Sequence, residues 1–404
     1  MSASLANVVD TFRQWLHLPD PAPLLASLGA VAANRLAGDP VWLLLVGSPG
    51  SGKSEILGPL KHLADVHPVA TLTEAALLSG SPKRDHDAQS SGGLLREIGS
   101  SGIILCKDFG SVLSMNRDAR ASVLAALREI YDGSWTRHVG TDGGKTLAWS
   151  GRMGLIAGCT PTIDRHHAVM GSMGERFVIL RLGKTDEDDQ ARRALAHAGD
   201  EGAMRDELAA ATAALFEAGL STPRALTDGE REGLIALTPL IVRCRSAIER
   251  DGYTREIELI PPAEAPARLI VVLSRLLAGL DAIGVERATA WQLVARIALD
   301  CVPALKQKLL AVLYEAGDNV ELSTTELAEA VDYLANTAPR RALEELGAHG
   351  IVERFTYGEG RPHTWRLTDW ARARYLVATT VPETSGGPLE YPHRVIDDIS
   401  GRAA

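Results

Sequence analysis

The chain has 404 residues, enough for two or three domains with a sizeable buried core. Hydrophobic residues make up 46% and charged residues 23%, and the net charge of −9 excludes wholesale basic binding to nucleic acid, so any such contact must come from local clusters. No apolar run approaches the roughly 20 residues of a membrane helix, and the N-terminus lacks a secretory pattern. We therefore expect a cytoplasmic protein with no membrane partner.

Periodicity along the chain predicts an α/β protein with additional helical parts. An N-terminal segment reads as helical, an alternation of strands and helices then indicates a largely parallel sheet with helices on both faces, and a helical region follows. A smaller module comes next, and the prolines and glycines of the tail predict disorder. The expected divisions are 1–38 (N-terminal helical segment), 39–185 (core), 186–300 (helical lid), 301–378 (C-terminal module) and 379–404 (tail).

Four cysteines are widely spaced, and no two of them form a CxxC pair: Cys106, Cys159, Cys244 and Cys301. Each lies in an apolar context, which predicts buried free thiols rather than disulfides or a metal site.

The clearest motif is a glycine-rich loop between a buried strand and a helix. Val41–Val46 is a continuous apolar run, as expected for a strand buried on both faces, and the loop follows it directly. Glycines allow backbone N–H groups to close around phosphates, Lys53 would reach the β- and γ-phosphates of ATP, and the Ser54 hydroxyl would bind Mg²⁺. The expected nucleotide-binding residues are Gly47, Ser48, Pro49, Gly50, Ser51, Gly52, Lys53, Ser54 and Glu55.

A second apolar strand ends in a single carboxylate, Asp108. Phosphate-loop ATPases commonly place two acids here, one beside Mg²⁺ and one that polarises the attacking water. If Ile104–Lys107 are the strand positions, Asp108 is the magnesium-side residue and Phe109 replaces the base. If Ile103–Cys106 are, Lys107 replaces the magnesium-side acid and Asp108 is the base. Either way Asp108 is the candidate acid, with a plain turn residue as the alternative.

Hydrolysis with one acid is expected to be slower than with two. Two nearby acids could assist it, Glu129 and Asp132.

Three further patterns follow in order along the chain. Two strand-like runs around Asp142-Gly143-Gly144 predict a β-hairpin. A core strand then ends at Thr160, and the sequence Gly-Glu-Arg-Phe places Arg176 at the start of one more strand.

The order of phosphate loop, acidic strand, hairpin, polar-ended strand and Gly-Glu-Arg-Phe resembles an AAA+ ATPase. More narrowly, it is similar to the minichromosome-maintenance-like and superfamily-three-like helicases and replication initiators, including those of phages and mobile elements. The resemblance implies that Thr160 orients the attacking water and that Arg176 is an arginine finger for the neighbouring subunit's nucleotide. Thr160 departs mildly from the asparagine that is commoner there. The alternatives are that Thr160 only ends a strand and that Arg176 is a structural ion-pair partner.

In such helicases the hairpin points into a central channel and grips DNA. By this resemblance its contacts would be Lys145 at the turn and Arg137 and His138 on the first arm. A solvated turn lysine is the alternative for Lys145.

A helical lid follows the core in AAA+ proteins, and one of its arginines contacts the nucleotide. Prolines precede a helix that carries Arg268, which makes Arg268 the candidate for this role. Arg224 is the competitor, and a solvated arginine at a helix start is the alternative for Arg268.

The C-terminal module reads as three helices and a hairpin, similar to a winged helix-turn-helix. Ser323 and Glu326 form a capping-box pattern at the second helix. DNA would contact the third helix and the wing through Thr337, Arg340, Arg341, Arg354, Arg361 and His363. The stretch 301–376 carries nine Lys/Arg against eleven Asp/Glu, so a protein-interaction module is the alternative.

Taken together, these patterns favour an ATP-hydrolysing AAA+ protein that acts on single-stranded or duplex DNA as a homo-oligomeric ring, a helicase or replication initiator with ATP and Mg²⁺ as cofactors. An ATP-controlled regulator with slow hydrolysis, which binds DNA or a partner protein, is the second hypothesis. A metabolic phosphate-loop kinase is the third, and no substrate motif supports it.

Overall fold

The computed structural model describes residues 2–79, 93–140, 144–166, 176–183, 185–358 and 361–382. Nearly all of the tail predicted to be disordered lies outside these residues. So do residues 141–143 of the hairpin turn, and residues 359–360 between the two strands of the C-terminal hairpin.

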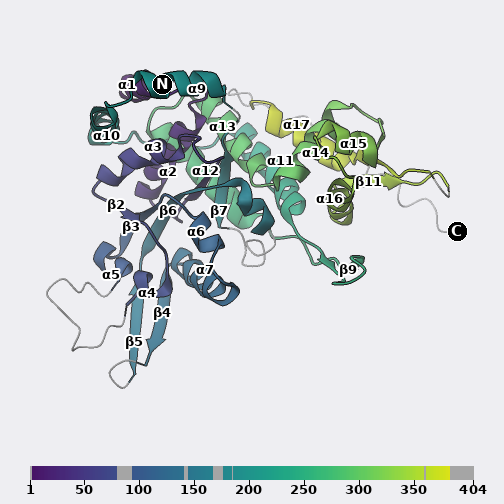
Figure 1. Ribbon diagram of the computed structural model, residues 1–404, viewed down its shortest axis with the longest axis horizontal. Coiled ribbons are helices and arrows are strands. Elements are labelled where there is room, and N and C mark those ends of the chain that lie inside the picture. Colours follow the sequence, from purple (N-terminus) through teal and green to yellow (C-terminus); the bar gives the residue numbers. More distant parts are fainter. Residues whose placement is uncertain are drawn as a thin grey trace.

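A five-stranded parallel sheet forms the centre of the molecule (Figure 1). Its strand order is β2-β3-β6-β1-β7. After β1 the chain crosses to the edge strand β2, returns through β3 to β6 beside β1, and then adds β7 on the other side of β1. The strands are β1 (Trp42–Val46), β2 (Val66–Val69), β3 (Ser101–Cys106), β6 (Arg152–Cys159) and β7 (Phe177–Arg181). Every residue of β1 is buried, as its unbroken apolar sequence predicts for a strand flanked on both edges and covered on both faces.

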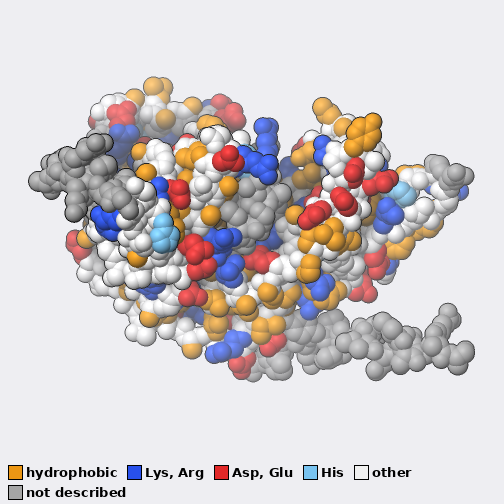
Figure 2. All heavy atoms as spheres, turned by 90° about the horizontal axis from the view of Figure 1, so that it is seen from below, with side chains coloured by type: hydrophobic (Ala, Val, Ile, Leu, Met, Phe, Trp, Pro, Cys, Tyr) orange, Lys and Arg blue, Asp and Glu red, His pale blue; other side chains and the backbone are white. Residues whose placement is uncertain are grey.

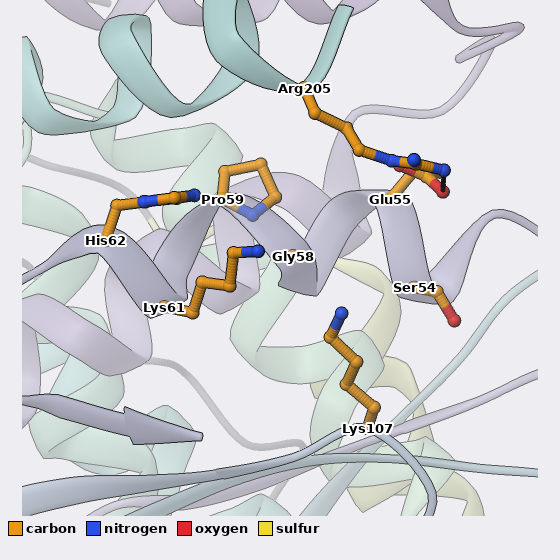
Figure 3. A pocket seen from close by; sticks show the side chains of 8 residues that line it. All are labelled: Ser54, Glu55, Gly58, Pro59, Lys61, His62, Lys107 and Arg205. Carbon is orange, nitrogen blue, oxygen red and sulfur yellow. Dashed lines mark hydrogen bonds and ion pairs between the residues drawn. The ribbon is translucent and has the colours of Figure 1, made fainter. Parts of the chain in front are cut away.

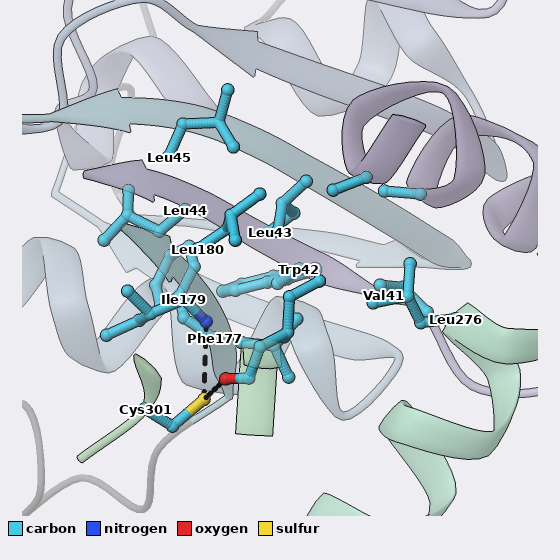
Figure 4. Close-up of a cluster of buried hydrophobic side chains, with 14 of the residues drawn as sticks. Val41, Trp42, Leu43, Leu44, Leu45, Phe177, Ile179, Leu180, Leu276 and Cys301 are labelled. Carbon is cyan, nitrogen blue, oxygen red and sulfur yellow. Dashed lines mark hydrogen bonds between the residues drawn. The ribbon is translucent and has the colours of Figure 1, made fainter. Parts of the chain in front are cut away.

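Helices cover both faces of the sheet, which confirms the predicted α/β fold with a parallel sheet. Trp42 packs against Phe177 of β7 and against Tyr131 of α7 on one face. Figure 4 shows this core, where the Cys301 thiol donates to the Ile297 carbonyl at 3.2 Å and accepts the Ile179 N–H at 3.4 Å. The core's other helices are α3 (Lys53–Leu57), η1 (Gly58–His62), α4 (Glu74–Leu77), α5 (Leu94–Ile98), α6 (Gly110–Leu113), α7 (Arg117–Tyr131) and η4 (Pro161–His166).

The N-terminal helices α1 (Ala3–Trp15) and α2 (Ala22–Arg35) form as predicted, separated around Pro21. Helix α2 packs against β1, β6 and, most extensively, α12 (Ala267–Ala282). Two glycines allow that close approach, because a Cβ at Gly279 would lie 2.2 Å from the Gly29 carbonyl oxygen. The segment before the phosphate loop is therefore built into the core of the structure.

The region after β7 is helical, as predicted, apart from a two-stranded arm. Its strand β9 is exposed along its whole length and pairs with β8. Its elements are α9 (Glu187–Ala196), α10 (Glu201–Glu217), α11 (Asp228–Arg245), β8 (Glu249–Arg250), β9 (Ile257–Leu259), α12 (Ala267–Ala282) and α13 (Arg287–Asp300).

The C-terminal module contains the three predicted helices and the predicted hairpin, and Ser323 and Glu326 form the expected capping box. Two elements were not predicted. Strand β10 makes the sheet three-stranded, and a last helix, α17, packs back on α11. The elements are α14 (Ala304–Glu315), β10 (Leu322–Ser323), α15 (Thr324–Ala330), α16 (Thr337–Ala348), β11 (Val352–Phe355), β12 (Thr364–Leu367) and α17 (Asp369–Thr379).

Two expectations from composition can be checked directly. All four cysteines are free and buried, which confirms the prediction for the thiols. Among the residues that the structure describes, no helix has the length and apolar character needed to span a bilayer.

Candidate functional site

The phosphate loop joins the carboxyl end of β1 to α3. Gly50 and Gly52 have φ values of +79° and +80°, a left-handed conformation that favours glycine, and a Cβ at either position would meet nothing within 4 Å. The open side of the loop can therefore receive a ligand close to the backbone, which fits the phosphates expected from the motif. Gly58 and Pro59 follow, and the α-helix continues as a 3₁₀ turn.

Lys53 lies inside the loop. Its ammonium donates to the carbonyl oxygens of Gly47 at 2.7 Å and Ser48 at 2.8 Å, and to the Ser51 hydroxyl at 3.1 Å. Burial lowers the pKa of Lys53, while the nearby Asp108 carboxylate acts in the opposite direction. The lysine is thus held beside the open face of the loop, at the place where a phosphate group would receive its charge.

Asp108 and Thr160 come to the same edge of the sheet as the loop, because β3, β6 and β1 are parallel neighbours. Cys159, the last residue of β6, is paired with Val46, and its carbonyl accepts the Gly47 N–H at 3.1 Å. Thr160 follows directly, and its hydroxyl is 2.6 Å from that of Thr162. The two chain segments expected to complete the nucleotide site therefore lie beside the loop.

The end of β3 distinguishes the two registers that the sequence left open. The strand ends at Cys106, so Lys107 occupies the first position after it and Asp108 the second, as in the second alternative. Phe109 is buried and donates its N–H to the Gly158 carbonyl at 2.7 Å. The Asp108 side chain is exposed and accepts the Gly110 N–H at 2.9 Å.

The two thiols near this edge of the sheet, those of Cys106 and Cys159, are unreactive. Burial raises the pKa of Cys106 and that of Cys159 to about 11. Both therefore remain protonated at neutral pH, and neither is suited to act as a nucleophile or a metal ligand.

A pocket beside α3 adds four basic side chains that the sequence analysis did not single out as a group. It is lined by Ser54, Glu55, Gly58, Pro59, Lys61, His62, Lys107 and Arg205 (Figure 3). Arg205 comes from α10, and its guanidinium lies 3.3 Å from the Glu55 carboxylate. Gln190 of α9 donates to the Gly50 carbonyl at 2.7 Å. Local sequence patterns carried no signal for either contact, because each partner is more than 100 residues away from the loop.

These residues do not fit a magnesium ion. Mg²⁺ in proteins takes oxygen ligands, usually one or two carboxylates together with substrate phosphates. Here the Glu55 carboxylate faces Arg205, one oxygen of Asp108 accepts a backbone N–H, and a lysine stands where the second acid was expected. Within the described ranges, no group of three His, Cys, Asp or Glu side chains could hold a metal ion.

Arg176 lies at the other edge of the sheet, just before β7, whose Phe177 is paired with Trp42 at the start of β1. Its side chain is 8% exposed, and one guanidinium nitrogen is 2.7 Å from Asp132. The structure thus places Arg176 in an intramolecular ion pair, away from the phosphate loop of its own chain.

The lid arginines also lie away from the loop. Arg268 lies in the first turn of α12, and its guanidinium is 3.8 Å from the carboxylate of Glu264, which precedes the helix. Two turns later, Arg275 donates to the carbonyls of Ala33 and Leu36, just ahead of the start of β1. Further along α12, Gly279 lies beside Gly29, so α12 runs antiparallel to α2. The N-terminus of α12, with Arg268, therefore lies towards the amino ends of the strands. Arg224, the competitor, is paired with Asp281 at 2.6 Å.

The predicted hairpin forms from β4 (Ser134–Val139) and β5 (Lys145–Ser150) and projects from the body of the molecule (Figure 1). Arg137 and Lys145 lie on one face of it and His138 on the other. Arg137 donates to the Leu78 carbonyl at 2.7 Å and faces Glu74, whereas His138 is exposed and bonded to Thr146 at 3.1 Å.

In the C-terminal module, the candidate DNA contacts are mostly exposed. Thr337 and Arg340 lie in the first turn of α16, and Arg341 is half-buried behind them. On the wing, Arg354 and Arg361 are exposed, and His363 is 3.0 Å from Thr356. Figure 2 shows positive and negative side chains interspersed over one face of the molecule, without an extended patch of one sign.

No protein-family model and no curated protein matches the sequence. Three solved structures show distant similarity. An active helicase of the SCCmec type IV element, Cch, has a TM-score of 0.35 and 10% identity, covering 93% of this chain and 71% of that one. The Orc1 protein of Aeropyrum pernix, solved in complex with DNA, has a TM-score of 0.28 and 16% identity, covering 91% and 96%. The C-terminal region of NrS-1 has a TM-score of 0.24 and 12% identity, covering 90% and 75%. At these scores the fold assignment rests on the sheet and the loop of this chain.

Proposed function

We propose that this protein binds ATP at the phosphate loop and hydrolyses it, as an AAA+ protein that acts on DNA. The observation that carries the proposal is the meeting of Lys53, Asp108 and Thr160 at the carboxyl edge of three parallel strands, beside a loop whose glycines leave room for phosphates. Preorganised donors of this kind stabilise the charge that develops in phosphoryl transfer.

Each residue has a role that follows from its place. The loop N–H groups and Lys53 bind the phosphates, and the Ser54 hydroxyl supports them. Asp108 accepts a proton from the attacking water, and Thr160 orients that water. The expectation that Ser54 and Asp108 hold Mg²⁺ is not carried into this proposal, because the pocket's donor set does not fit the ion.

We assign the parts of the chain as the sequence suggested: 39–185 as the ATPase core, 186–300 as the lid and 301–378 as the winged-helix module. In this arrangement the hairpin and the C-terminal module contact DNA, and Arg176 acts on the nucleotide of a neighbouring subunit in a homo-oligomeric ring. The finger role requires Arg176 to exchange Asp132 for a phosphate. Arg268 has no part in the site as proposed, because it lies towards the opposite edge of the sheet.

Two observations favour a second candidate, an ATP-controlled regulator with slow hydrolysis. A lysine replaces one of the two expected acids, and Arg176 is paired within its own chain. A switch needs nucleotide binding and a change of assembly, and it tolerates slow turnover.

The steady-state ATPase rate, measured without DNA and with single-stranded or duplex DNA, separates these candidates. A motor or initiator is expected to be stimulated by DNA, and the stimulation is expected to disappear in Lys53→Ala and in Arg176→Ala. A slow rate that is indifferent to DNA favours the regulator. If Lys53→Ala hydrolyses ATP as fast as the wild type, the site itself is assigned wrongly.

A further inference from the structure

The pocket beside the phosphate loop is lined by more positively charged side chains than the carboxylate of Glu55 can neutralise. Figure 3 shows the ammonium groups of Lys61 and Lys107 both directed into it, from the 3₁₀ turn after the loop and from the end of β3. The carboxylate on the lining, that of Glu55, is bonded to Arg205. Across the described ranges neither Lys61 nor Lys107 makes an ion pair, so both charges face the pocket uncompensated.

The backbone fixes where Lys107 points. Its carbonyl oxygen packs so closely on β6 that a Cβ at Gly158 would lie 2.7 Å from it, and the Phe109 N–H bonds to the Gly158 carbonyl at 2.7 Å. Lys107 itself lines the pocket, while Phe109, two residues further along, is buried with its ring centre 5.2 Å from that of Phe177. The lysine therefore reaches the pocket from a rigid position and not from a free surface loop.

The size and chemistry of the pocket suit part of a phosphate chain. Its volume of about 120 Å³ is below that of a site for a whole nucleotide, and it opens beside Ser54, the last residue of the loop. Lysine is a strong point-charge ligand for phosphate oxygens. A positively charged side chain and a divalent cation would compete for the same oxygens of the ligand, and they repel each other.

We propose that Lys107 binds the terminal phosphates of the nucleoside triphosphate directly, assisted by Lys61, and supplies the positive charge that a carboxylate-held metal ion supplies elsewhere. Nucleotide binding by this protein consequently does not require a divalent cation. This inference rests on the nucleotide site proposed above and deepens it.

The test is an equilibrium titration of the full chain with a fluorescent ATP analogue, once with excess EDTA and once with MgCl₂. The wild type is expected to bind with affinities that agree within about threefold in the two buffers. Lys107→Gln is expected to lose affinity in EDTA by roughly 10- to 100-fold, the effect of one charge-assisted hydrogen bond. Lys107→Asp restores the pair of acids and is expected to bind only with Mg²⁺.

Lys308→Gln is the matched control, because Lys308 is an exposed lysine of α14 outside this pocket. It is expected to bind as the wild type does in both buffers. Circular dichroism of each variant checks that it is folded, and Lys107 is itself exposed, so its replacement is not expected to unfold the chain.

Two results overturn the inference while leaving the proposed function intact: a wild type that binds only with Mg²⁺, or a Lys107→Gln variant that binds in EDTA as tightly as the wild type. A different result removes the proposed function and the inference with it. That result is a wild type that binds no nucleotide in either buffer, or binding that Lys53→Ala does not weaken.

Discussion

Arg176 and Asp132 form an ion pair, with a guanidinium nitrogen 2.7 Å from a carboxylate oxygen, at the edge of the sheet opposite to the phosphate loop. The arginine also lies over the ring of Tyr131, with its guanidinium carbon 5.3 Å from the ring centre. Strand β1 begins beside Phe177 and ends at the phosphate loop, so its whole length separates Arg176 from the loop of its own chain. Any contribution that it makes to hydrolysis must come through a second copy.

The first prediction follows from that separation. Arg176→Ala and Lys53→Ala are each expected to abolish ATP hydrolysis, and an equimolar mixture of the two is expected to recover part of it. In a mixed ring, about a quarter of the interfaces combine an intact loop with an intact arginine on the adjacent subunit. The recovered rate should therefore approach a quarter of the wild-type rate.

The control for this mixture is Arg192→Ala, an exposed arginine of α9 that pairs with Asp189 and is expected to hydrolyse normally. A mixture that stays inactive, although both variants assemble, contradicts a shared site. Arg176 is then the structural ion-pair partner that the sequence also allowed.

The second prediction concerns the hairpin, where the candidate DNA-binding residues differ in whether they already make contacts within the chain. Lys145→Gln is expected to lower DNA affinity and to reduce the slope of log affinity against log salt concentration by about one, the value for one lost phosphate contact. Arg137→Gln is expected to leave the slope unchanged and to lower the thermal midpoint, because Arg137 bonds to the Leu78 carbonyl and faces Glu74. Fluorescence anisotropy of labelled oligonucleotides at several salt concentrations measures both slopes. A change of slope in Arg137→Gln would show that this arginine leaves α4 to contact DNA.

Sequence patterns predicted the parts of this protein that depend on neighbouring residues. The buried strand before the loop, the hairpin of β4 and β5, and the capping box at Ser323 are all formed within short stretches of chain. Their periodicity or spacing carries the information.

What the sequence did not predict depends on contacts between distant segments. Glu55 and Arg205 are 150 positions apart, and the pairing of Arg176 with Asp132 spans 44. Whether Lys107 is the last residue of the strand or the first residue after it could not be decided from periodicity. In the structure β3 ends at Cys106, so Lys107 follows the strand. Strand β10 is only two residues long, too short to produce a pattern.

The third prediction tests the contact between α2 and α12. Gly279→Ala is expected to destabilise the protein by about 1–3 kcal/mol, because the added methyl group would lie 2.2 Å from the Gly29 carbonyl oxygen and backbone must move to admit it. Gly202→Ala is the matched control, since Gly202 lies in α10 and a Cβ there meets nothing within 4 Å. It is expected to be neutral or to stabilise by up to about 1 kcal/mol. Thermal unfolding of the two variants beside the wild type measures the difference, and equal midpoints would mean that the two helices are not packed as described.

The fourth prediction uses a buried ion pair inside the helical region. Glu230 and Arg287 are 3% and 7% exposed, and two hydrogen bonds of 2.6 and 2.8 Å join them. Burial raises the pKa of Glu230, but the hydrogen bonds from Arg287 and from the Thr227 N–H outweigh it, so the pKa lies below the ordinary glutamate value. The pair therefore stabilises the fold at pH values above that ordinary value, and the contribution is lost as the pH falls and the carboxylate is protonated.

Glu230→Gln is accordingly expected to cost about 3 kcal/mol at pH 7, because the buried Arg287 charge loses its hydrogen-bonded carboxylate and keeps only Asp281, at 3.7 Å. The difference from the wild type is expected to shrink as the pH falls below the ordinary glutamate pKa, because the unfolded chain and then the folded protein take up the proton. Thermal midpoints measured as the pH is lowered give the comparison, with Glu217→Gln, an exposed glutamate at the end of α10, as the control that should show no such trend. A destabilisation that stays constant down to pH 3 would mean that Glu230 contributes by its shape and hydrogen bonds rather than by its charge.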